Sequence, residues 1–391
     1  MCVPVLAFSS ARALTLSWAG LHLLHFGFLQ ILPVVSQFTP GVTFFSFSLP
    51  MAGDFSPLWS FCQTIGYRLA ILLYAGAGIG YTSLVERLLI IDGNALMHRA
   101  YHAIPMLNNK TGQPTNAVYG FILMLQNLLG NFKSKYLLVA FDEKEKTFRK
   151  KDYERYQAKR PKMDDWLVTQ MALVRVWLEV ADICFISKGG YEADDVIGTI
   201  TKSQMLKKQM INETIIVTGD RDIFQLINEK VKVFTPTKGL SNGKLWGEEE
   251  VKAEFDFAPI QMVDYKALVG DSSDNYPGVA GVGPKTARDL IVKYQSVENI
   301  YKHLDEISPT VRTKLEKGAK DALFFHKLAT IFTEVPVKFD LEKCNSWNMQ
   351  SVAVADFYQE FGFRSFLAKM TQTKTVITKI KTKNIEQMSL I

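Results

Sequence analysis

Cysteine is scarce in this chain of 391 residues, and no two cysteines stand in a CxxC pair. The four cysteines are too few and too scattered for a disulfide scaffold, and the spacing typical of zinc sites is missing. A strong charge imbalance is also absent, because the net charge of +6 permits a nucleic-acid partner without requiring one. With 48% hydrophobic and 21% charged residues, the composition excludes a disordered or collagen-like chain.

Charge is almost missing from the first 80 residues, whose only charged side chains are Arg12, Asp54 and Arg68. Residues 13–35 contain no Asp, Glu, Lys or Arg and are long enough to cross a bilayer of ~30 Å. Three interpretations of residues 1–85 stay open: a start codon assigned too early, a membrane segment, or a small separate domain. We expect a cytoplasmic protein, with membrane association through residues 13–35 as the alternative.

From residue 88 onward, short apolar runs of strand length alternate with longer helical stretches. This alternation predicts an α/β fold with a mostly parallel sheet flanked by helices. The predicted strands cover residues 88–91, 136–141, 183–186 and 215–218.

Acidic residues follow each of these four strands, and a fifth acidic group lies in the polar turn at residues 270–275. Ligands of open parallel sheets bind at the carboxyl ends of the strands, so these side chains are expected to converge. One Asp alone would be explained as a helix cap, but recurrence at four strand ends is not. Converging carboxylates need cations, and oxygen ligands without His or Cys indicate Mg²⁺ or Mn²⁺. Two such ions about 4 Å apart serve displacement at a phosphodiester.

Six motifs resemble the 5′-nuclease domain of bacterial DNA polymerase I, which belongs to the flap endonuclease superfamily and has a PIN-like core. In chain order they are LLIIDGNALMHRAYHA (88–103), TGQPTNAVYGF (111–121), AFDEKEKTFR (140–149), YEADDVIGTI (191–200), TGDRDIFQL (218–226) and GDSSDNYPGVAGVGPKTA (270–287). The resemblance covers residues 86–345. It implies a PIN-like nuclease core over residues 86–260, with a helical arch at about 143–170. A C-terminal helix-hairpin-helix subdomain follows at 261–345, and residues 346–391 are a tail.

The resemblance also implies two metal sites. The first is expected to be formed by Asp92, Asp142, Glu192 and Asp194. The second is expected to be formed by Asp195, Asp220, Asp222, Asp271 and Asp274. All nine acidic positions are present.

Residues 144–162 hold nine basic side chains, with Phe148, Tyr153 and Tyr156 between them. Such a composition suits a non-specific grip on a single strand, although a charge run alone is usually a solvated helix face. The resemblance makes this segment the arch, with Arg149, Arg160 and Tyr156 as catalytic residues and Lys150, Lys151 and Lys159 as DNA-binding residues. The arch of the family commonly reads Tyr-Lys-x-x-Arg. Here Gln157 replaces the lysine.

The string GVAGVGPKTA at 278–287 is no Walker motif, because Pro284 separates Gly283 from Lys285. A helix-hairpin-helix is expected instead, in which backbone N–H groups approach a DNA phosphate and read no base sequence. Gly281, Gly283, Lys285 and Thr286 are its expected DNA contacts, with K⁺ as an expected ion there.

These observations predict a metal-dependent, structure-specific 5′-3′ exonuclease and 5′-flap endonuclease of DNA replication and repair. It is expected to be a monomer that uses two Mg²⁺ ions, with Mn²⁺ able to substitute. Its partners would be DNA with 5′ flaps or 5′ ends, RNA-primed DNA and a separate DNA polymerase. Because no polymerase portion follows, a stand-alone nuclease and a truncated gene product both stay open. The alternatives are a non-catalytic DNA-binding protein on a nuclease fold and a PIN-type ribonuclease.

Overall fold

The computed structural model describes residues 6–9, 42–45, 86–203, 206, 211–237 and 242–371. Within the first part it describes two strands, β1 (Leu6–Ser9) and β2 (Val42–Phe45), which pair antiparallel. Contacts divide the chain into two units, Met1–Thr82 and Ser83–Ile391. Residues 13–35, considered above as a membrane segment, lie outside the described residues. No described helix is long and apolar enough to cross a membrane.

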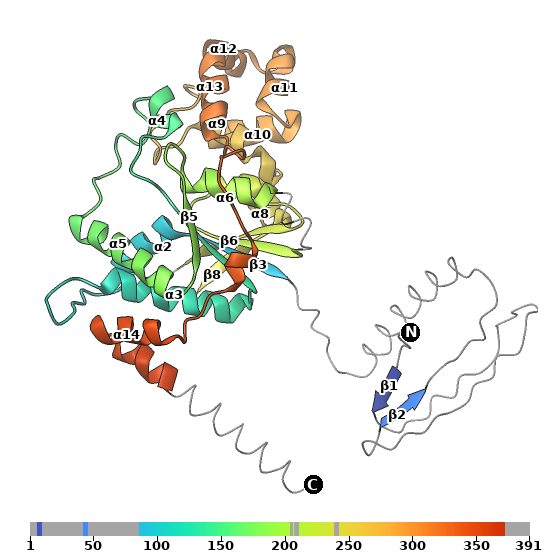
Figure 1. Cartoon of the computed structure of the whole chain (residues 1–391). Helices are drawn as coiled ribbons and strands as arrows, with labels where there is room; N and C mark the ends of the chain where they lie inside the picture. The colour runs from blue at the N-terminus through green and yellow to red at the C-terminus, as the bar shows by residue number, and fades with distance from the viewer. Residues whose placement is uncertain are drawn as a thin grey trace, which may run out of the picture. The chain divides into compact units, whose positions relative to one another are not determined.

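A six-stranded sheet forms the centre of the second unit (Figure 1). Its strands are β3 (Arg87–Asp92), β4 (Tyr136–Phe141), β5 (Cys184–Ser187), β6 (Glu213–Val217), β7 (Val231–Pro236) and β8 (Gly243–Trp246). They lie in the order β5-β4-β3-β6-β7-β8, and only β8 is antiparallel to its neighbour. The predicted mostly parallel sheet is therefore confirmed. The strand order reverses between β3 and β6, which is the position where parallel sheets hold their ligands.

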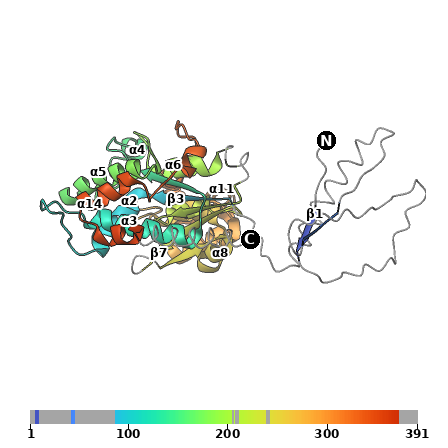
Figure 2. The same cartoon turned by 60° about the horizontal axis from the view of Figure 1, so that its bottom comes forward.

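Both faces of the sheet are buried, because alternate residues of each strand point to opposite sides. Leu88 and Ile90 face one apolar core, and Leu89 and Ile91 face the other. Helices cover both sides (Figures 1 and 2). The core of Leu88 includes α6 (Ala193–Lys202) and α8 (Glu248–Phe255), and the core of Leu89 includes α2 (Gly93–Ala103), α3 (Asn116–Phe132) and α5 (Asp165–Val180).

The chain then forms a helical subdomain, drawn in yellow to orange in Figure 1. Its helices are α9 (Met262–Val269), α10 (Pro284–Tyr294), α11 (Val297–Lys302), α12 (Pro309–Lys317) and α13 (Ala319–Ala329), with the short turns η2 (Pro259–Gln261) and η3 (Leu304–Glu306). Helices α9 and α10 pack together across a loop at residues 270–283. This is the helix, hairpin and helix expected from the glycine-rich string.

The expected arch is less helical than predicted. Between β4 and α5 it contains one helix of five residues, α4 (Phe148–Asp152), followed by a turn at residues 154–159. Gln157 has a φ of 54°, outside the helical region, and its backbone N–H donates to the carbonyl of Asp274 at 2.9 Å. That tertiary hydrogen bond replaces a helical one, so the interpretation of residues 156–160 as helix is wrong.

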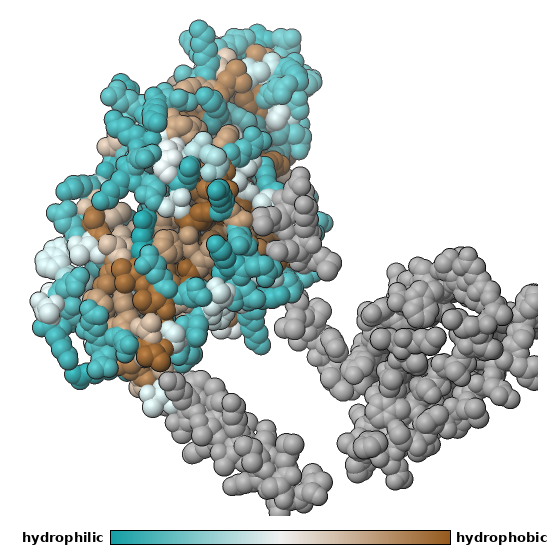
Figure 3. Space-filling model, viewed as in Figure 1, coloured by the Kyte–Doolittle hydropathy of each residue, from teal (hydrophilic) through white to brown (hydrophobic). Residues whose placement is uncertain are grey.

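Residues 346–371 also differ from the prediction of a tail. After the turn η4 (Glu342–Asn345), the helix α14 (Val352–Glu360) packs onto the core that contains α3 and α5. Phe363 and Phe366, which follow it, are almost fully buried. This segment therefore belongs to the nuclease unit. Apolar residues gather around α14 in Figure 3. Val352, the first residue of α14, is exposed.

Candidate metal and nucleic-acid site

A cavity of about 640 Å³ opens at the carboxyl edge of the sheet. Seven of the nine predicted carboxylates line it: Asp92, Asp142, Glu192, Asp194, Asp220, Asp222 and Asp274. They come from the ends of β3, β4 and β6, from the start of α6 and from the loop after α9. The parallel strand order thus brings together acids that are up to 182 residues apart, Asp92 and Asp274 being the extremes.

The side chains at the strand ends are held by local hydrogen bonds. Asp92 caps α2 by accepting from the backbone N–H of Ala95 at 3.0 Å, and its other oxygen accepts from the Thr218 hydroxyl at 2.7 Å. Asp142 accepts from the backbone N–H of Ala193 at 2.7 Å and from the amide of Asn94 at 2.9 Å. Asp92 therefore caps α2 and also lines the cavity. An Asp at a strand end can be a helix cap and a site carboxylate at the same time.

The pKa values of these acids are raised by burial and by their neighbouring negative charges, which bound cations would neutralise. Burial raises the pKa of Asp92 to about 7, with Asp142 adding to the effect, and burial likewise raises the pKa of Glu192 to about 7. Burial and the charges of Asp220 and Asp92 raise the pKa of Asp194 well above its ordinary value. Among the described residues, none donates a hydrogen bond to the Asp194 carboxylate. A half-buried carboxylate that accepts no hydrogen bond and lies beside other acids fits a divalent-cation ligand.

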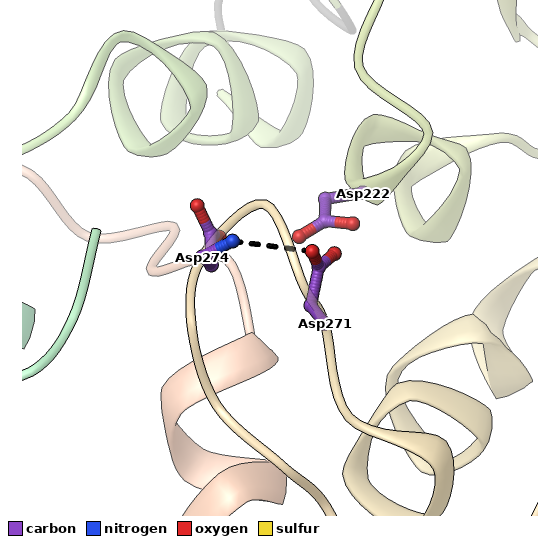
Figure 4. Close-up of side chains that lie close together, drawn as sticks. All are labelled: Asp222, Asp271 and Asp274. Carbon is purple, nitrogen blue, oxygen red and sulfur yellow. Dashed lines mark hydrogen bonds between the residues drawn. The ribbon is translucent and has the colours of Figure 1, made fainter. Parts of the chain in front are cut away.

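A second group lies beside the first. Asp222, Asp271 and Asp274 each offer a carboxylate oxygen within 4.8 Å of the others. Figure 4 shows Asp271 and Asp274 on one loop, with Asp222 facing them from the first residue of η1 (Asp222–Leu226). The backbone N–H of Asp274 donates to Asp271 at 3.2 Å, which is the dashed line in that figure.

The loop that carries Asp271 and Asp274 is closed by glycine. Gly270 has a φ of 83°, and a Cβ there would come within 2.4 Å of the Pro277 backbone, so only glycine allows this crossing of the chain. Asp271 and Tyr276 then exchange two backbone hydrogen bonds at 2.8 and 3.0 Å.

Lys266, on α9, is a site residue that the sequence interpretation missed. Its ammonium contacts Asp222 and lies 2.6 Å from Asp271. Although burial raises the pKa of Asp271, Lys266 outweighs it and lowers that pKa to about 2. The available signal was a lone lysine in the apolar helix that leads into the acidic turn.

Two predicted site residues are placed differently. Asp195 was expected to bind metal and Arg149 to be a catalytic residue, but the structure buries them against each other, at 2.7 and 2.8 Å. Asp195 does not line the cavity. Arg149 lines it and is only 3% exposed. Its guanidinium is therefore turned into the protein, where it contacts Asp195 and Glu192.

The other predicted arch residues converge on Asp274. Its carboxylate accepts hydrogen bonds from the Tyr156 hydroxyl at 3.0 Å, from the Gln157 amide at 3.2 Å and from Arg160 at 2.7 Å. Burial, followed by Glu192 and Asp274, raises the pKa of Tyr156, so it is a proton donor at neutral pH. The structure brings these three side chains to the cavity.

The predicted DNA-binding lysines of the arch, Lys150, Lys151 and Lys159, are exposed, and Lys150 also lines the cavity. In the helical subdomain, Gly283 immediately precedes α10, Gly281 has a φ of 79°, and both are exposed. The other two expected DNA contacts lie on the first turn of α10, where Lys285 is exposed and Thr286 is half-buried. An exposed helix start with a nearby lysine suits a phosphate.

Carboxylates at the carboxyl edge of a mostly parallel sheet, next to a basic segment, define a nuclease that uses divalent cations. Comparison with known proteins agrees. Residues 87–256 match the family described as 5′-3′ exonuclease, N-terminal resolvase-like domain, and residues 257–351 match 5′-3′ exonuclease, C-terminal SAM fold. The chain belongs to the 5′-3′ exonuclease family.

Two relatives and one solved structure show how much of the chain is similar to known proteins. A 5′-3′ exonuclease of Aquifex aeolicus is 37% identical over 259 residues, covering 66% of this chain and 86% of the relative. DNA polymerase I of Bacillus subtilis is 37% identical over 286 residues, covering 73% of this chain but 32% of the polymerase. The chain thus spans about a third of the length of the polymerases it matches. A solved flap endonuclease of bacteriophage T5, in complex with DNA and metal ions, shares the fold, with a TM-score of 0.53, 18% identity and coverage of 75% and 99%.

Proposed function

We propose that this protein is a Mg²⁺-dependent 5′-3′ exonuclease and 5′-flap endonuclease that acts on DNA. The observation that carries the proposal is the set of seven carboxylates that line one cavity together with the arch side chains of Tyr156 and Arg160. Carboxylates alone would bind a cation, and cationic side chains alone would bind a phosphate. The presence of both at the carboxyl edge of the sheet supports hydrolysis of a phosphodiester.

The donor set supports Mg²⁺. All candidate ligands are carboxylate oxygens, which are the ligands of hard cations. His98 also lines the cavity but is not one of the candidate ligands. Asp92, Asp142, Glu192 and Asp194 would hold one ion, and Asp220, Asp222, Asp271 and Asp274 the other. When bound, the two ions supply charge neutralisation at the phosphate and activation of the attacking water. Mn²⁺ would substitute for Mg²⁺.

The residues of the chain itself have separate tasks in this proposal. Tyr156 remains protonated at neutral pH and can donate to an oxygen at the cavity. Arg160, whose side chain is half exposed, has guanidinium N–H groups for a phosphate beside Asp274. The exposed lysines of the arch and the start of α10 would bind backbone phosphates on either side, which positions DNA without reading its sequence. K⁺ at the loop before α10 would belong to the same contact.

The natural substrates would be 5′ flaps, free 5′ ends and RNA-primed DNA. Because the matched relatives include DNA polymerases of about three times the matched length, a DNA polymerase acting on the same ends is the partner we propose. The protein would act as a monomer in replication and repair.

A cleavage assay tests the proposal. A duplex with a labelled 5′ flap is incubated with the protein in Mg²⁺, in Mn²⁺ and in EDTA, beside a recessed 5′ end and a single-stranded RNA of equal length. We expect cutting at the flap base and at the 5′ end with either ion and none in EDTA. Binding without cutting would indicate the non-catalytic alternative, and preference for the RNA would indicate a PIN-type ribonuclease. The Asp194→Asn variant controls for contaminating nucleases.

A further inference from the structure

A strap of chain at residues 328–335 leaves the helical subdomain at the end of α13 and crosses α6 of the nuclease core. Its backbone is held there by side chains of the core. The N–H of Ile331 donates to Gln225 at 2.9 Å, and the N–H of Val335 donates to the Thr199 hydroxyl at 3.0 Å. The strap is therefore one connection between the helical subdomain and α6, in addition to the apolar core that they share.

Arg149 joins this strap to the base of the arch. Its guanidinium has five N–H donors, and it donates five hydrogen bonds in the structure. Three go to carboxylates, two of them to Asp195 and one to Glu192 at 3.2 Å. The other two go to the backbone carbonyls of Leu328 at 2.9 Å and Thr330 at 2.8 Å. No donor of Arg149 is left for a phosphate.

Asp195 is saturated in the same way. A carboxylate offers about four lone-pair sites, and four donors reach this one. Two N–H groups of Arg149 bind its two oxygens. The backbone N–H of Phe332 adds a bond of 2.9 Å to one oxygen, and the backbone N–H of Glu192 adds a bond of 3.0 Å to the other. With 0% exposure, the side chain has no site left for a metal ion.

We infer that Arg149 and Asp195 form a positioning pair, which touches neither metal nor phosphate. The pair fixes three segments with separate tasks: α4 at the base of the arch, the start of α6 with Glu192, and the strap from the DNA-binding subdomain. This inference rests on the proposed nuclease function and assigns two of its expected site residues to a different role. Its consequence is that the pair connects the helical subdomain, which would hold DNA, to the start of α6, which carries carboxylates of the cavity.

Metal binding separates this role from that of a ligand. The full chain is titrated with Mn²⁺ in the absence of DNA, and free Mn²⁺ is measured by electron paramagnetic resonance. We expect Asp195→Asn to bind as many ions as the wild type with about tenfold weaker affinity, since outer partners of a ligand have effects of this order. The matched control, Asp194→Asn, should lose an ion. Loss of an ion in Asp195→Asn would overturn the inference.

Cleavage adds a second readout. Raising the Mn²⁺ concentration should restore most of the single-turnover rate of Asp195→Asn and little of that of Asp194→Asn. A rate of Asp195→Asn that stays low at saturating Mn²⁺, as in the ligand variant, contradicts a positioning role.

A double-mutant cycle tests whether the two residues act through each other. The variants are Arg149→Met, Asp195→Leu and the double replacement. Apolar pairs of similar volume can replace buried ion pairs without loss of folding, so the double variant is expected to melt close to the wild type. If each single change lowers the rate about 100-fold, the double change should cost no more than the worse single. Multiplication of the two losses would show independent roles and overturn the inference.

These results are distinguishable from failure of the proposed function. A wild-type protein that cuts no 5′ flap would refute the nuclease proposal. The number of Mn²⁺ ions bound by Asp195→Asn and the melting temperatures of the cycle would still decide the role of the pair.

Discussion

The hydroxyl of Tyr156 donates a hydrogen bond of 3.0 Å to Asp274, 118 residues further along the chain. The same hydroxyl lies 3.2 Å from Glu192, so one arch side chain joins both groups of cavity carboxylates. Tyr156 itself packs in a small apolar cluster with Tyr276 and Phe325, which fixes its ring. The arch is therefore attached to the acids it faces through a side chain with little freedom to move.

The first prediction concerns this hydroxyl. Tyr156→Phe keeps the packed ring and removes the hydroxyl, whose single O–H donates to Asp274 or Glu192 with a net contribution of about 0.5–1.5 kcal/mol. We expect a loss of about 2- to 13-fold in the single-turnover rate on a 5′ flap, with the melting temperature lowered by no more than a few degrees. Tyr153→Phe is the matched control on the same segment and should have no effect on the rate. An unchanged rate in Tyr156→Phe would show that the hydroxyl takes no part.

The second prediction concerns the acids at the strand ends. Asp92→Ala and Asp142→Ala should each lower cleavage at least about 1000-fold, because each removes a carboxylate required for a bound ion. DNA affinity measured in Ca²⁺ should change little, since the phosphate contacts lie on the arch and at the start of α10. EDTA should have the same effect on the wild type. Normal cutting by either variant would refute the metal assignment.

The third prediction is a pH dependence of stability without metal. The folded pKa values of Asp92 and Glu192 are about 7, above the values of the unfolded chain. Between about pH 4 and about pH 7 the folded state therefore binds more protons than the unfolded state, and the free energy of unfolding falls as pH rises through this window. In EDTA the melting temperature should decrease from about pH 4.5 to about pH 7.5.

Divalent ions reverse this trend, because they replace the protons as neutralising charge. In saturating Mg²⁺ the decrease should disappear, and the apparent Mg²⁺ affinity should weaken below about pH 7 as protons compete. Asp92→Asn should show a shallower decrease in EDTA than the wild type. A melting temperature in EDTA that rises over the same range would contradict the raised pKa values.

The fourth prediction concerns the residue that departs from the family pattern. The Gln157 amide donates to Asp274 at 3.2 Å, so a lysine there would bring an ammonium to the same carboxylate. We expect Gln157→Lys to raise the single-turnover rate on a 5′ flap several-fold, because charged donors bind phosphate oxygens more strongly than amides do. Lys159→Ala, which changes an exposed side chain of the same turn, should affect DNA affinity more than rate. A lower rate in Gln157→Lys would show that the amide is required as such.

The sequence alone determined the sheet and the acids at its edge. Apolar runs such as residues 88–91 and 136–141 are continuous because both faces of a parallel strand are buried, and this pattern is local. An acid directly after such a run lies at the carboxyl edge whatever the rest of the fold is. Asp92 and Asp142 could therefore be assigned to one place from the sequence, and the glycine-rich string could be assigned to a hairpin between helices.

Only the tertiary structure decided which charged side chains neutralise one another. Asp194 and Asp195 are adjacent in sequence, yet successive helix residues point about 100° apart. One faces the cavity, and the other faces Arg149 from 46 residues away. Lys266 likewise became a site residue through its contacts with Asp222 and Asp271. The turn at Gln157 and the docking of α14 depend on distant partners as well. A residue's type fixes what it can bind, but its partner is fixed by packing between distant segments, which no local pattern records.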